Sequence, residues 1–199
     1  MSEEIEREFK NIITKDEFNL LLNTFHISIQ DFVTQKNHYF DTQYFTLKEK
    51  SAALRIRELP GYYELTLKRK STDGVIETNQ IIDHKEVDFL LTNNILPIGE
   101  VNNTLIKLGV PVQDLVYFGS LTTDRAELEY KGGKLVFDHS HYLGIEDYEL
   151  EYEVTDWELG KSIFTNLLNR LNISPRPTDT KVGRLYHAKL DIMKQSNKE

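Results

Sequence analysis

The stretch E-I-E-R-E-F-K, residues 4–10, decides the fold because charged and apolar side chains alternate along it. In an extended strand Ile5 and Phe9 would point to one face, whereas a helix would scatter them around its axis. The opposite face would consist of Glu4, Glu6, Glu8 and Lys10. Carboxylates this close repel one another unless something positive neutralises them. The sequence therefore predicts an amphipathic strand whose acidic face has a positive partner.

Composition and charge restrict the class of protein. The chain has 199 residues, of which 39% are hydrophobic and 28% charged, as is typical of a soluble globular protein with a full core. Its net charge of -8 disfavours a general nucleic-acid surface, because phosphate contacts require clustered Lys and Arg. The lack of cysteine excludes disulfides and thiolate metal ligands. With no long apolar run and an acidic start, we expect a cytoplasmic protein that binds neither membrane nor nucleic acid.

Alternating residues and tight turns predict a chain rich in antiparallel strands. The predicted strands after the first are residues 37–42, 52–58, 62–70, 75–82, 116–121, 123–130, 134–138 and 148–154. The turn signals between them are Pro60-Gly61, Asp73-Gly74 and Lys131-Gly132-Gly133. Predicted helices start at the Thr14–Glu17 capping box and cover residues 84–91, 100–108, 156–171 and 179–193. These elements predict an α+β fold in a single domain over residues 1–193, followed by a flexible tail at 194–199.

The polar face of the predicted sheet has its charges segregated by sign. Some predicted strands carry mainly basic side chains on this face, namely Arg55, Arg57, Lys68 and Lys70. Another carries the carboxylates of Glu149, Glu151 and Glu153. An ordinary solvated face mixes signs, because exposed ion pairs contribute at most about 1 kcal/mol each. Segregated charge indicates a cation for the glutamates and a polyanion for the Arg and Lys rows. Two interpretations stay open here: a solvated face, and an eight-stranded antiparallel barrel whose charged interior binds a ligand.

Several motifs, in order along most of the chain, resemble those of the CYTH superfamily, the triphosphate tunnel metalloenzymes. After E-x-E-x-K in the first strand they are Y-F-D-T (39–42), L-R-I-R (54–57), L-T-L-K (65–68), Arg125, L-V-F-D (135–138), L-G-I-E-D-Y-E-L-E-Y-E (143–153) and Lys181. Each motif is weak by itself, but the ordered set on predicted strands is specific. The chain looks most similar to the short, single-domain bacterial members of the YjbK type.

The resemblance implies an α+β fold built on a closed eight-stranded antiparallel β-barrel, a tunnel with helices packed outside. It implies catalytic roles for Glu6, Glu8 and Lys10, which match E-x-E-x-K, while Glu4 and Glu6 match its first half two residues earlier. The implied substrate-binding residues are Arg55, Arg57, Lys68, Lys70, Arg125 and Lys181. The implied metal ligands are Glu4, Glu6, Glu8, Glu149, Glu151 and Glu153, and their carboxylate oxygens suit Mg²⁺ or Mn²⁺. Val75 and Thr123 stand where family members often carry Arg and Lys.

The implied activity is divalent-metal-dependent hydrolysis of a triphosphate, either inorganic triphosphate, a nucleoside triphosphate or thiamine triphosphate. Two alternatives stay open: an adenylate cyclase of the class IV type, and a module that binds a polyphosphate or nucleotide without turnover. A small-molecule triphosphate is the expected partner, and a homodimer is left open. His38, His139 and His141 have no third ligand at metal-binding spacing, so we expect surface or turn roles for them.

Overall fold

The described part of the chain, residues 3–72 and 74–196 of the computed structural model, falls into two units. Unit 1 is formed by residues 3–6 and 35–120, and unit 2 by residues 7–34 and 121–196. The expectation of a single domain over residues 1–193 stays a prediction.

Residues 4–10 form parts of two strands instead of the single strand that their alternation predicts. The first is β1 (Glu3–Glu6), the second is β2 (Glu8–Ile13), and Arg7 lies between them. β1 pairs with a strand of unit 1 and β2 with a strand of unit 2. Alternation alone cannot reveal such a break, because both strands keep the same period of two residues.

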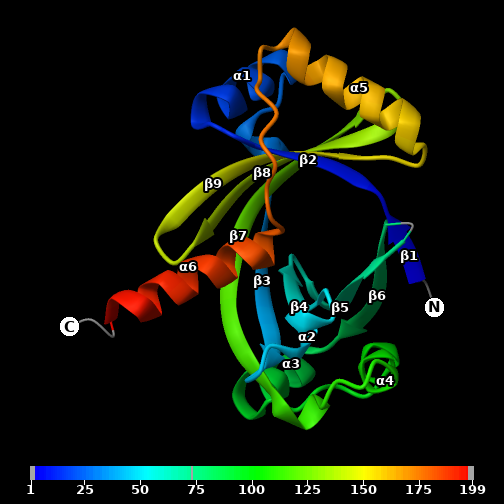
Figure 1. The fold of residues 1–199 in the computed structure, drawn as a ribbon, viewed down its shortest axis with the longest axis vertical. Helices are drawn as coiled ribbons and strands as arrows, with labels where there is room; N and C mark the ends of the chain where they lie inside the picture. Colours follow the sequence, from blue (N-terminus) through cyan, green and yellow to red (C-terminus); the bar gives the residue numbers. More distant parts are fainter. Residues whose placement is uncertain (1–2, 73, 197–199) are drawn as a thin grey trace. The chain divides into compact units, whose positions relative to one another are not determined.

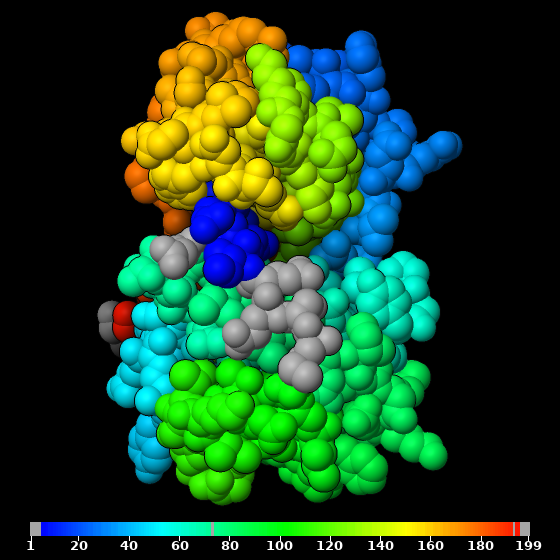
Figure 2. Space-filling view, turned by 90° about the vertical axis from the view of Figure 1, so that its right-hand side faces the viewer, coloured from blue at the N-terminus to red at the C-terminus, as the bar shows by residue number. Residues whose placement is uncertain are grey.

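Unit 1 is an antiparallel sheet whose apolar face packs on helices. Its strands in bonded order are β1, β6 (Gly74–Ile82), β5 (Tyr62–Ser71), β4 (Ala52–Leu59) and β3 (Val33–Thr42). Its helices are α2 (Thr46–Glu49), α3 (His84–Asn93) and α4 (Glu100–Lys107). The buried cluster joins leucines and isoleucines of β4 and β5, such as Leu54 and Leu67, to Leu90 of α3 and Leu105 of α4. Figure 1 shows α3 and α4 on one side of this sheet, and Figure 2 shows the green surface around α4.

Unit 2 holds the remaining antiparallel strands, with helices at both faces. Its strands in bonded order are β7 (Leu115–Tyr130, from residue 121), β8 (Gly133–Tyr142), β9 (Ile145–Glu153) and β2. Its helices are α1 (Lys15–Phe25), α5 (Trp157–Arg170) and α6 (Lys181–Ser196). Phe18 of α1 and Phe164 of α5 share a buried cluster with Phe137, Leu150 and Tyr152 of the sheet. Figure 1 shows α1 and α5 above the sheet and the start of α6 below it.

Local sequence signals explain most of these elements. The capping box that begins α1 is present, since the Thr14 hydroxyl accepts from the backbone N–H of Glu17 and the Glu17 carboxylate accepts from that of Thr14. The hairpin turn between β7 and β8 has positive φ at Lys131 (48°) and Gly132 (84°), as a tight two-residue turn requires. Both predictions are confirmed.

The structure also differs locally from what the sequence predicts. The strands predicted at residues 116–121 and 123–130 are one continuous strand, β7. Helix α2 and the 3₁₀ turns η1 (Ile29–Asp31) and η2 (Val112–Asp114) were not predicted, because they are too short to show a helical period.

The C-terminal tail predicted at residues 194–199 begins as helix, because α6 continues to Ser196. The rest of that predicted tail, residues 197–199, lies outside the described residues, as does Asp73 of the predicted Asp73-Gly74 turn. Within the described chain, every helix is too short or too polar to cross a bilayer.

Candidate metal and phosphate site

The polar face of the unit 2 sheet collects acidic and basic side chains from four strands. In the antiparallel register, Arg125 of β7 lies opposite Asp138 of β8, and Asp138 lies opposite Glu149 of β9. Glu151 of β9 lies opposite Lys10 of β2. Directly opposite residues point to the same face, so these five side chains are neighbours. Lys10 and Glu151 are the most distant in sequence, 141 positions apart.

Asp138, Glu149 and Glu151 form a compact group that we call the carboxylate triad. One carboxylate oxygen from each lies within 4.8 Å of the others. All three side chains are buried, with residue exposures of 0%, 1% and 4% respectively. Buried carboxylates are found almost only where they are paired or coordinate a metal ion. Three hard oxygen donors at this spacing fit a divalent cation such as Mg²⁺ or Mn²⁺.

Lys181 and Arg125 compensate much of the negative charge of the triad. Lys181 Nζ lies 2.8 Å from Asp138 Oδ2 and 2.6 Å from Glu151 Oε1, and it also contacts Glu149. Arg125 donates from Nε (2.7 Å) and Nη2 (2.6 Å) to the two oxygens of Asp138, and from Nη2 to Glu151 at 2.9 Å. Such bidentate guanidinium contacts are also the geometry by which proteins bind phosphate.

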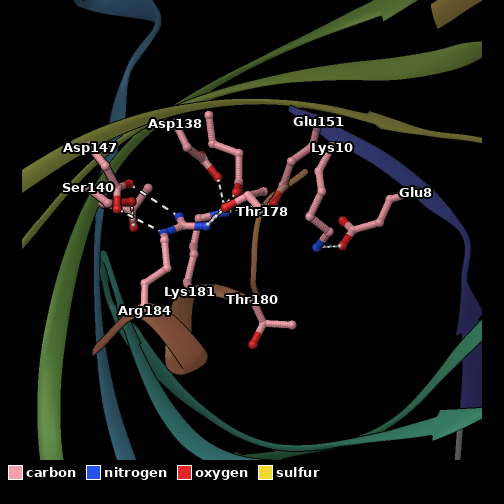
Figure 3. Close-up of polar contacts among 12 residues, drawn as sticks. Glu8, Lys10, Asp138, Ser140, Asp147, Glu151, Thr178, Thr180, Lys181 and Arg184 are labelled. Atoms are coloured by element: carbon pink, nitrogen blue, oxygen red, sulfur yellow. Dashed lines mark hydrogen bonds and ion pairs between the residues drawn. The ribbon is translucent and has the colours of Figure 1, made fainter. Parts of the chain in front are cut away.

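Helix α6 supplies a second basic residue one turn after Lys181. Arg184 donates from Nε to Asp147 at 2.9 Å and from Nη1 to Glu149 at 2.7 Å. Figure 3 shows Lys181 and Arg184 projecting from α6 toward Asp138, Glu151 and Asp147 on the sheet. Asp147 also accepts from the Tyr142 hydroxyl at 2.8 Å, and burial together with this bond raises the pKa of Tyr142 to about 12. Through its bonds to Asp147 and Glu149, Arg184 holds the edge of the triad in place.

The acids of the triad differ in their affinity for a proton. Burial raises the pKa of Glu149 to about 7, although Lys181 opposes the rise. Burial has the same tendency at Glu151, but the charges of Lys181 and Arg125 outweigh it and hold that pKa well below its usual value. Burial alone would lower the pKa of Lys181, yet Asp138, Glu151 and Glu149 hold it well above the usual value. At neutral pH the site therefore contains fixed charges and one carboxyl, Glu149, that is close to its titration point.

The segment between α5 and α6 positions Lys181 and Arg184. Asn11 of β2 donates to the Ser174 carbonyl at 3.1 Å and accepts from the backbone N–H of Arg176. The Arg176 guanidinium donates to both oxygens of Glu17, at 2.7 Å and 2.9 Å. This hydrogen bond is the main reason that the pKa of Glu17 is lowered. The contacts anchor the chain just before α6 begins.

The polar face of the unit 1 sheet carries its own charged group. Lys68 of β5 lies 2.7 Å from Glu6 of β1 and also contacts Glu77 of β6. Burial would raise the pKa of Glu77, but the Lys68 charge lowers it. Arg57 of β4 donates to Asn37 of β3 at 3.3 Å.

Arg55 of β4 is the buried basic residue of unit 1. It is 9% exposed, and its Nε has no hydrogen-bond partner among the described residues. An unsatisfied buried N–H costs roughly 1–3 kcal/mol, so this donor is suited to an anion. Lys70, by contrast, lies exposed near the end of β5.

The site residues expected from the sequence fall into one set in each unit. Unit 1 holds Glu4, Glu6, Arg55, Arg57, Lys68 and Lys70; unit 2 holds Glu8, Lys10, Arg125, Glu149, Glu151, Glu153 and Lys181. The backbone of Glu4 pairs with Glu77, and its side chain lies outside the described part. Glu8 contacts Lys10, and Glu153 lies 3.0 Å from Lys134. Of the expected metal ligands, Glu149 and Glu151 are therefore the two that meet in the triad.

Three residues of the unit 2 site were missed by sequence reasoning: Asp138, Asp147 and Arg184. Asp138 belongs to the quoted L-V-F-D motif but received no role, because its place opposite Arg125 depends on the register of β7 and β8. Asp147 extends the acidic alternation of β9 by one step. Arg184 follows Lys181 at the i+3 spacing that places two side chains on one helix face, which is a signal that the sequence did contain.

Comparison with known proteins identifies the family. The model of the CYTH domain matches residues 4–186. The chain belongs to the CYTH family. Over 189 residues it is 47% identical to a Bacillus subtilis (strain 168) protein named "Putative triphosphatase YjbK", a match that covers 95% of this chain and 98% of that protein.

Solved structures of CYTH-like proteins have the same fold. A Bacillus halodurans structure described as a "putative adenylate cyclase" is 42% identical, with a TM-score of 0.90 over 94% of this chain and 100% of that one. A Hippeastrum structure described as a "Putative adenylyl cyclase" with dominant triphosphatase activity is 23% identical, with a TM-score of 0.74 over 92% of this chain and 96% of that one. The fold class expected from the sequence is confirmed, with nine strands rather than eight among the described residues.

Membership of the CYTH family also bears on the metal. The family of triphosphate tunnel metalloenzymes implies a divalent ion, and the carboxylate triad provides buried oxygen donors for one. The expected absence of nucleic-acid binding and the open question of a homodimer stay predictions.

Proposed function

We propose that this CYTH protein hydrolyses the terminal phosphoanhydride bond of a small-molecule triphosphate with Mg²⁺ or Mn²⁺. The observation that carries the proposal is the carboxylate triad, whose buried acids are ion-paired with Lys181 and Arg125. The 47% identity to the protein named "Putative triphosphatase YjbK" supports it. A metal–triphosphate complex presents both signs of charge, and this site offers a partner for each.

Exchange of ion pairs explains how such a site can accept its substrate. Lys181 and Arg125 each contact two or more acids of the triad. With a metal–phosphate complex bound, the acids would hold the cation, and the ammonium and guanidinium groups would bind phosphate oxygens. No buried charge then loses its partner, which would cost roughly 3–5 kcal/mol. Binding of metal and phosphate is therefore expected to be mutually reinforcing.

We assign the residues of unit 2 two roles in catalysis, metal binding and phosphate binding. Asp138, Glu149 and Glu151 would hold the divalent ion, which supplies Lewis-acid polarisation of the phosphoryl oxygens when bound. Lys181 and Arg125 would orient phosphate oxygens and stabilise the charge that develops on them.

Glu8 and Lys10 complete the proposed machinery of unit 2. Lys10 lies opposite Glu151 in the register and contacts Glu8. We assign Glu8 to orienting the attacking water and accepting its proton, with Lys10 holding the Glu8 carboxylate in place.

Unit 1 carries basic residues of its own that are suited to phosphate. Arg55 has the strongest case, because its buried Nε lacks a hydrogen-bond partner among the described residues. We assign phosphate contacts also to Arg57, Lys68 and Lys70. Glu6, which pairs with Lys68, and Glu4 are candidates for further carboxylate contacts to a cation.

The decisive experiment is a panel of metals and substrates. Tripolyphosphate, ATP and thiamine triphosphate are each incubated with Mg²⁺, Mn²⁺ or EDTA, and orthophosphate is measured. We expect orthophosphate from at least one substrate with metal and none with EDTA. Tight substrate binding without any product under every metal would instead support a module that binds polyphosphate without turnover.

A second candidate function is cyclisation of a nucleoside triphosphate. It is favoured by the 42% identical Bacillus halodurans structure described as a "putative adenylate cyclase". Cyclisation of ATP would release pyrophosphate and cyclic AMP, whereas terminal hydrolysis releases orthophosphate and ADP. Measuring all four products from the same ATP reaction separates the two candidates.

A further inference from the structure

The face of the unit 2 sheet opposite the triad carries a second group of metal-binding side chains. One ligand atom each from Asp124, His139 and His141 lies within 4.8 Å of the other two. Asp138 and Ser140 alternate with these histidines along β8, so their side chains point to the other face. This group is therefore separate from the site proposed for the triphosphate.

The register of three strands creates this group. His139 and His141 share a face of β8 because they are two residues apart. Asp124 of β7 lies opposite His139, and Glu146 of β9 lies opposite His141. The sequence showed no third ligand for these histidines, because the third and fourth partners come from neighbouring strands. The expectation that they lack one is corrected by the register.

Neighbouring contacts already orient the side chains. The His139 ring stacks on Tyr148, with centroids 4.3 Å apart, and its Nε2 lies 2.9 Å from Glu146 Oε2. The Thr34 hydroxyl donates to Asp124 Oδ1 at 2.5 Å, while Asp124 Oδ2 lies 3.7 Å from His141 Nε2. The Thr34 hydroxyl is therefore an outer partner that holds the Asp124 carboxylate, as is typical of metal sites.

The site is open to solvent and has the donor chemistry of a transition metal. The exposed fractions of the side chains are 24% for His139, 44% for His141 and 36% for Asp124, so an ion can reach them. Two imidazole nitrogens with a carboxylate favour Zn²⁺ and similar ions, whereas Mg²⁺ prefers oxygen ligands alone. Lys15 of α1 acts on Glu146, whose pKa is lowered first by its contact with His139. Because that positive charge opposes a bound cation, Glu146 is given only an accessory role.

We propose that Asp124, His139 and His141 bind a transition-metal ion of the Zn²⁺ class, with Glu146 as an accessory ligand. The ion would link β7 to β8 on the face of the sheet opposite the triad. Coordination by Glu146 would add a link to β9. Because it binds the folded arrangement of three strands, it would stabilise unit 2 against unfolding. The inference stands apart from the triphosphatase proposal, since it uses none of the residues assigned to that reaction.

The test is calorimetric titration of the tag-free full-length protein with Zn²⁺ at pH 7.5, in excess Mg²⁺ so that oxygen-only sites are occupied. We expect one Zn²⁺ per chain. His141→Ala should weaken its affinity at least tenfold, and Asp124→Asn should weaken it to a smaller extent. His187→Ala is the matched control, because His187 is also an exposed histidine beside an aspartate, Asp179, and its loss should change nothing.

A second measurement does not depend on the folding of any variant. Co²⁺ added to the wild-type protein should give visible absorption bands of a nitrogen- and oxygen-ligated ion, and Zn²⁺ should displace them. Absence of the bands would overturn the proposal. So would Zn²⁺ binding that survives His141→Ala but disappears in Glu151→Gln, since the ion would then lie in the triad.

Discussion

The basic side chains on the polar faces of the two units differ in how fully they are paired. In unit 2, Lys181 and Arg125 are surrounded by acids at 2.6–2.9 Å, so the charges are compensated inside the face. In unit 1, the buried Arg55 keeps an Nε donor without a partner among the described residues. The difference indicates that unit 2 is organised to exchange a cation and an anion together, whereas Arg55 in unit 1 is organised for an anion.

The largest expected effect is in the triad. Glu151→Gln removes one metal ligand and a partner of both Lys181 and Arg125, so metal-dependent turnover should fall about 100-fold or more. Steady-state phosphate release at saturating Mg²⁺ measures it. Glu129→Gln is the matched control, because Glu129 is an exposed glutamate on β7 of the same unit, and it should keep normal turnover. Equal rates for Glu151→Gln and wild type would remove the triad from the mechanism.

The next largest effect is expected at Arg55 of unit 1. Arg55→Ala removes the unpartnered donor, so we expect KM for the triphosphate to rise about tenfold or more, since hydrogen bonds to charged groups contribute roughly 1.5–3 kcal/mol. Metal affinity should not change, whereas Glu151→Gln should lower it. Arg55→Lys keeps the charge without the planar fork and should recover part of the loss. If Arg55→Ala lowers metal affinity but leaves KM unchanged, the assignment of Arg55 to an anion is wrong.

The pH dependence of metal binding tests the triad further. Burial raises the pKa of Glu149 to about 7, so below that pH a metal ion must displace a proton. Affinity for Mn²⁺ should therefore rise with pH, by up to about tenfold per unit below pH 7, and level off above pH 8. Calorimetry from pH 6 to 8.5 measures this rise, and Glu149→Gln should flatten it.

The stability of the metal-free protein should fall as the pH rises, whereas the affinity for metal rises. A carboxyl whose pKa is raised from 4.5 to about 7 by folding binds its proton more tightly in the folded state. Its contribution to stability is therefore complete below pH 4.5 and is lost as the pH rises to about 7. Thermal unfolding in EDTA, compared between wild type and Glu149→Gln, isolates this contribution.

The smallest effect is expected at the anchor of α6. Arg176→Ala removes the bidentate contact with Glu17 that holds the chain just before Lys181. This ion pair is partly exposed, so global stability should change little. Amide exchange in residues 174–184 should nevertheless become faster, and turnover should fall slightly. Lys194→Ala, which breaks an exposed pair with Asp191 on the same helix, should leave both unchanged.

Much of the fold and part of the candidate site follow from local sequence signals. The alternation in β4 and β5, the capping box at Thr14 and the turn at Lys131-Gly132 each act within a few residues, and each was predicted correctly. The acidic row of β9 follows from the same alternation, whereas Lys181 was expected only from the resemblance to the CYTH motifs.

The tertiary structure decided which of these charges meet, because strand register joins residues that are distant in sequence. Lys181 reaches Glu149 across 32 positions, and the place of Asp138 beside Arg125 depends on one hairpin register. The same register brings Asp124 to His139 on the other face. By itself, the stretch E-I-E-R-E-F-K determined an amphipathic, acid-rich extended chain. Only pairing with different partner strands decided that it breaks at Arg7, placing Glu6 in unit 1 and Glu8 in unit 2.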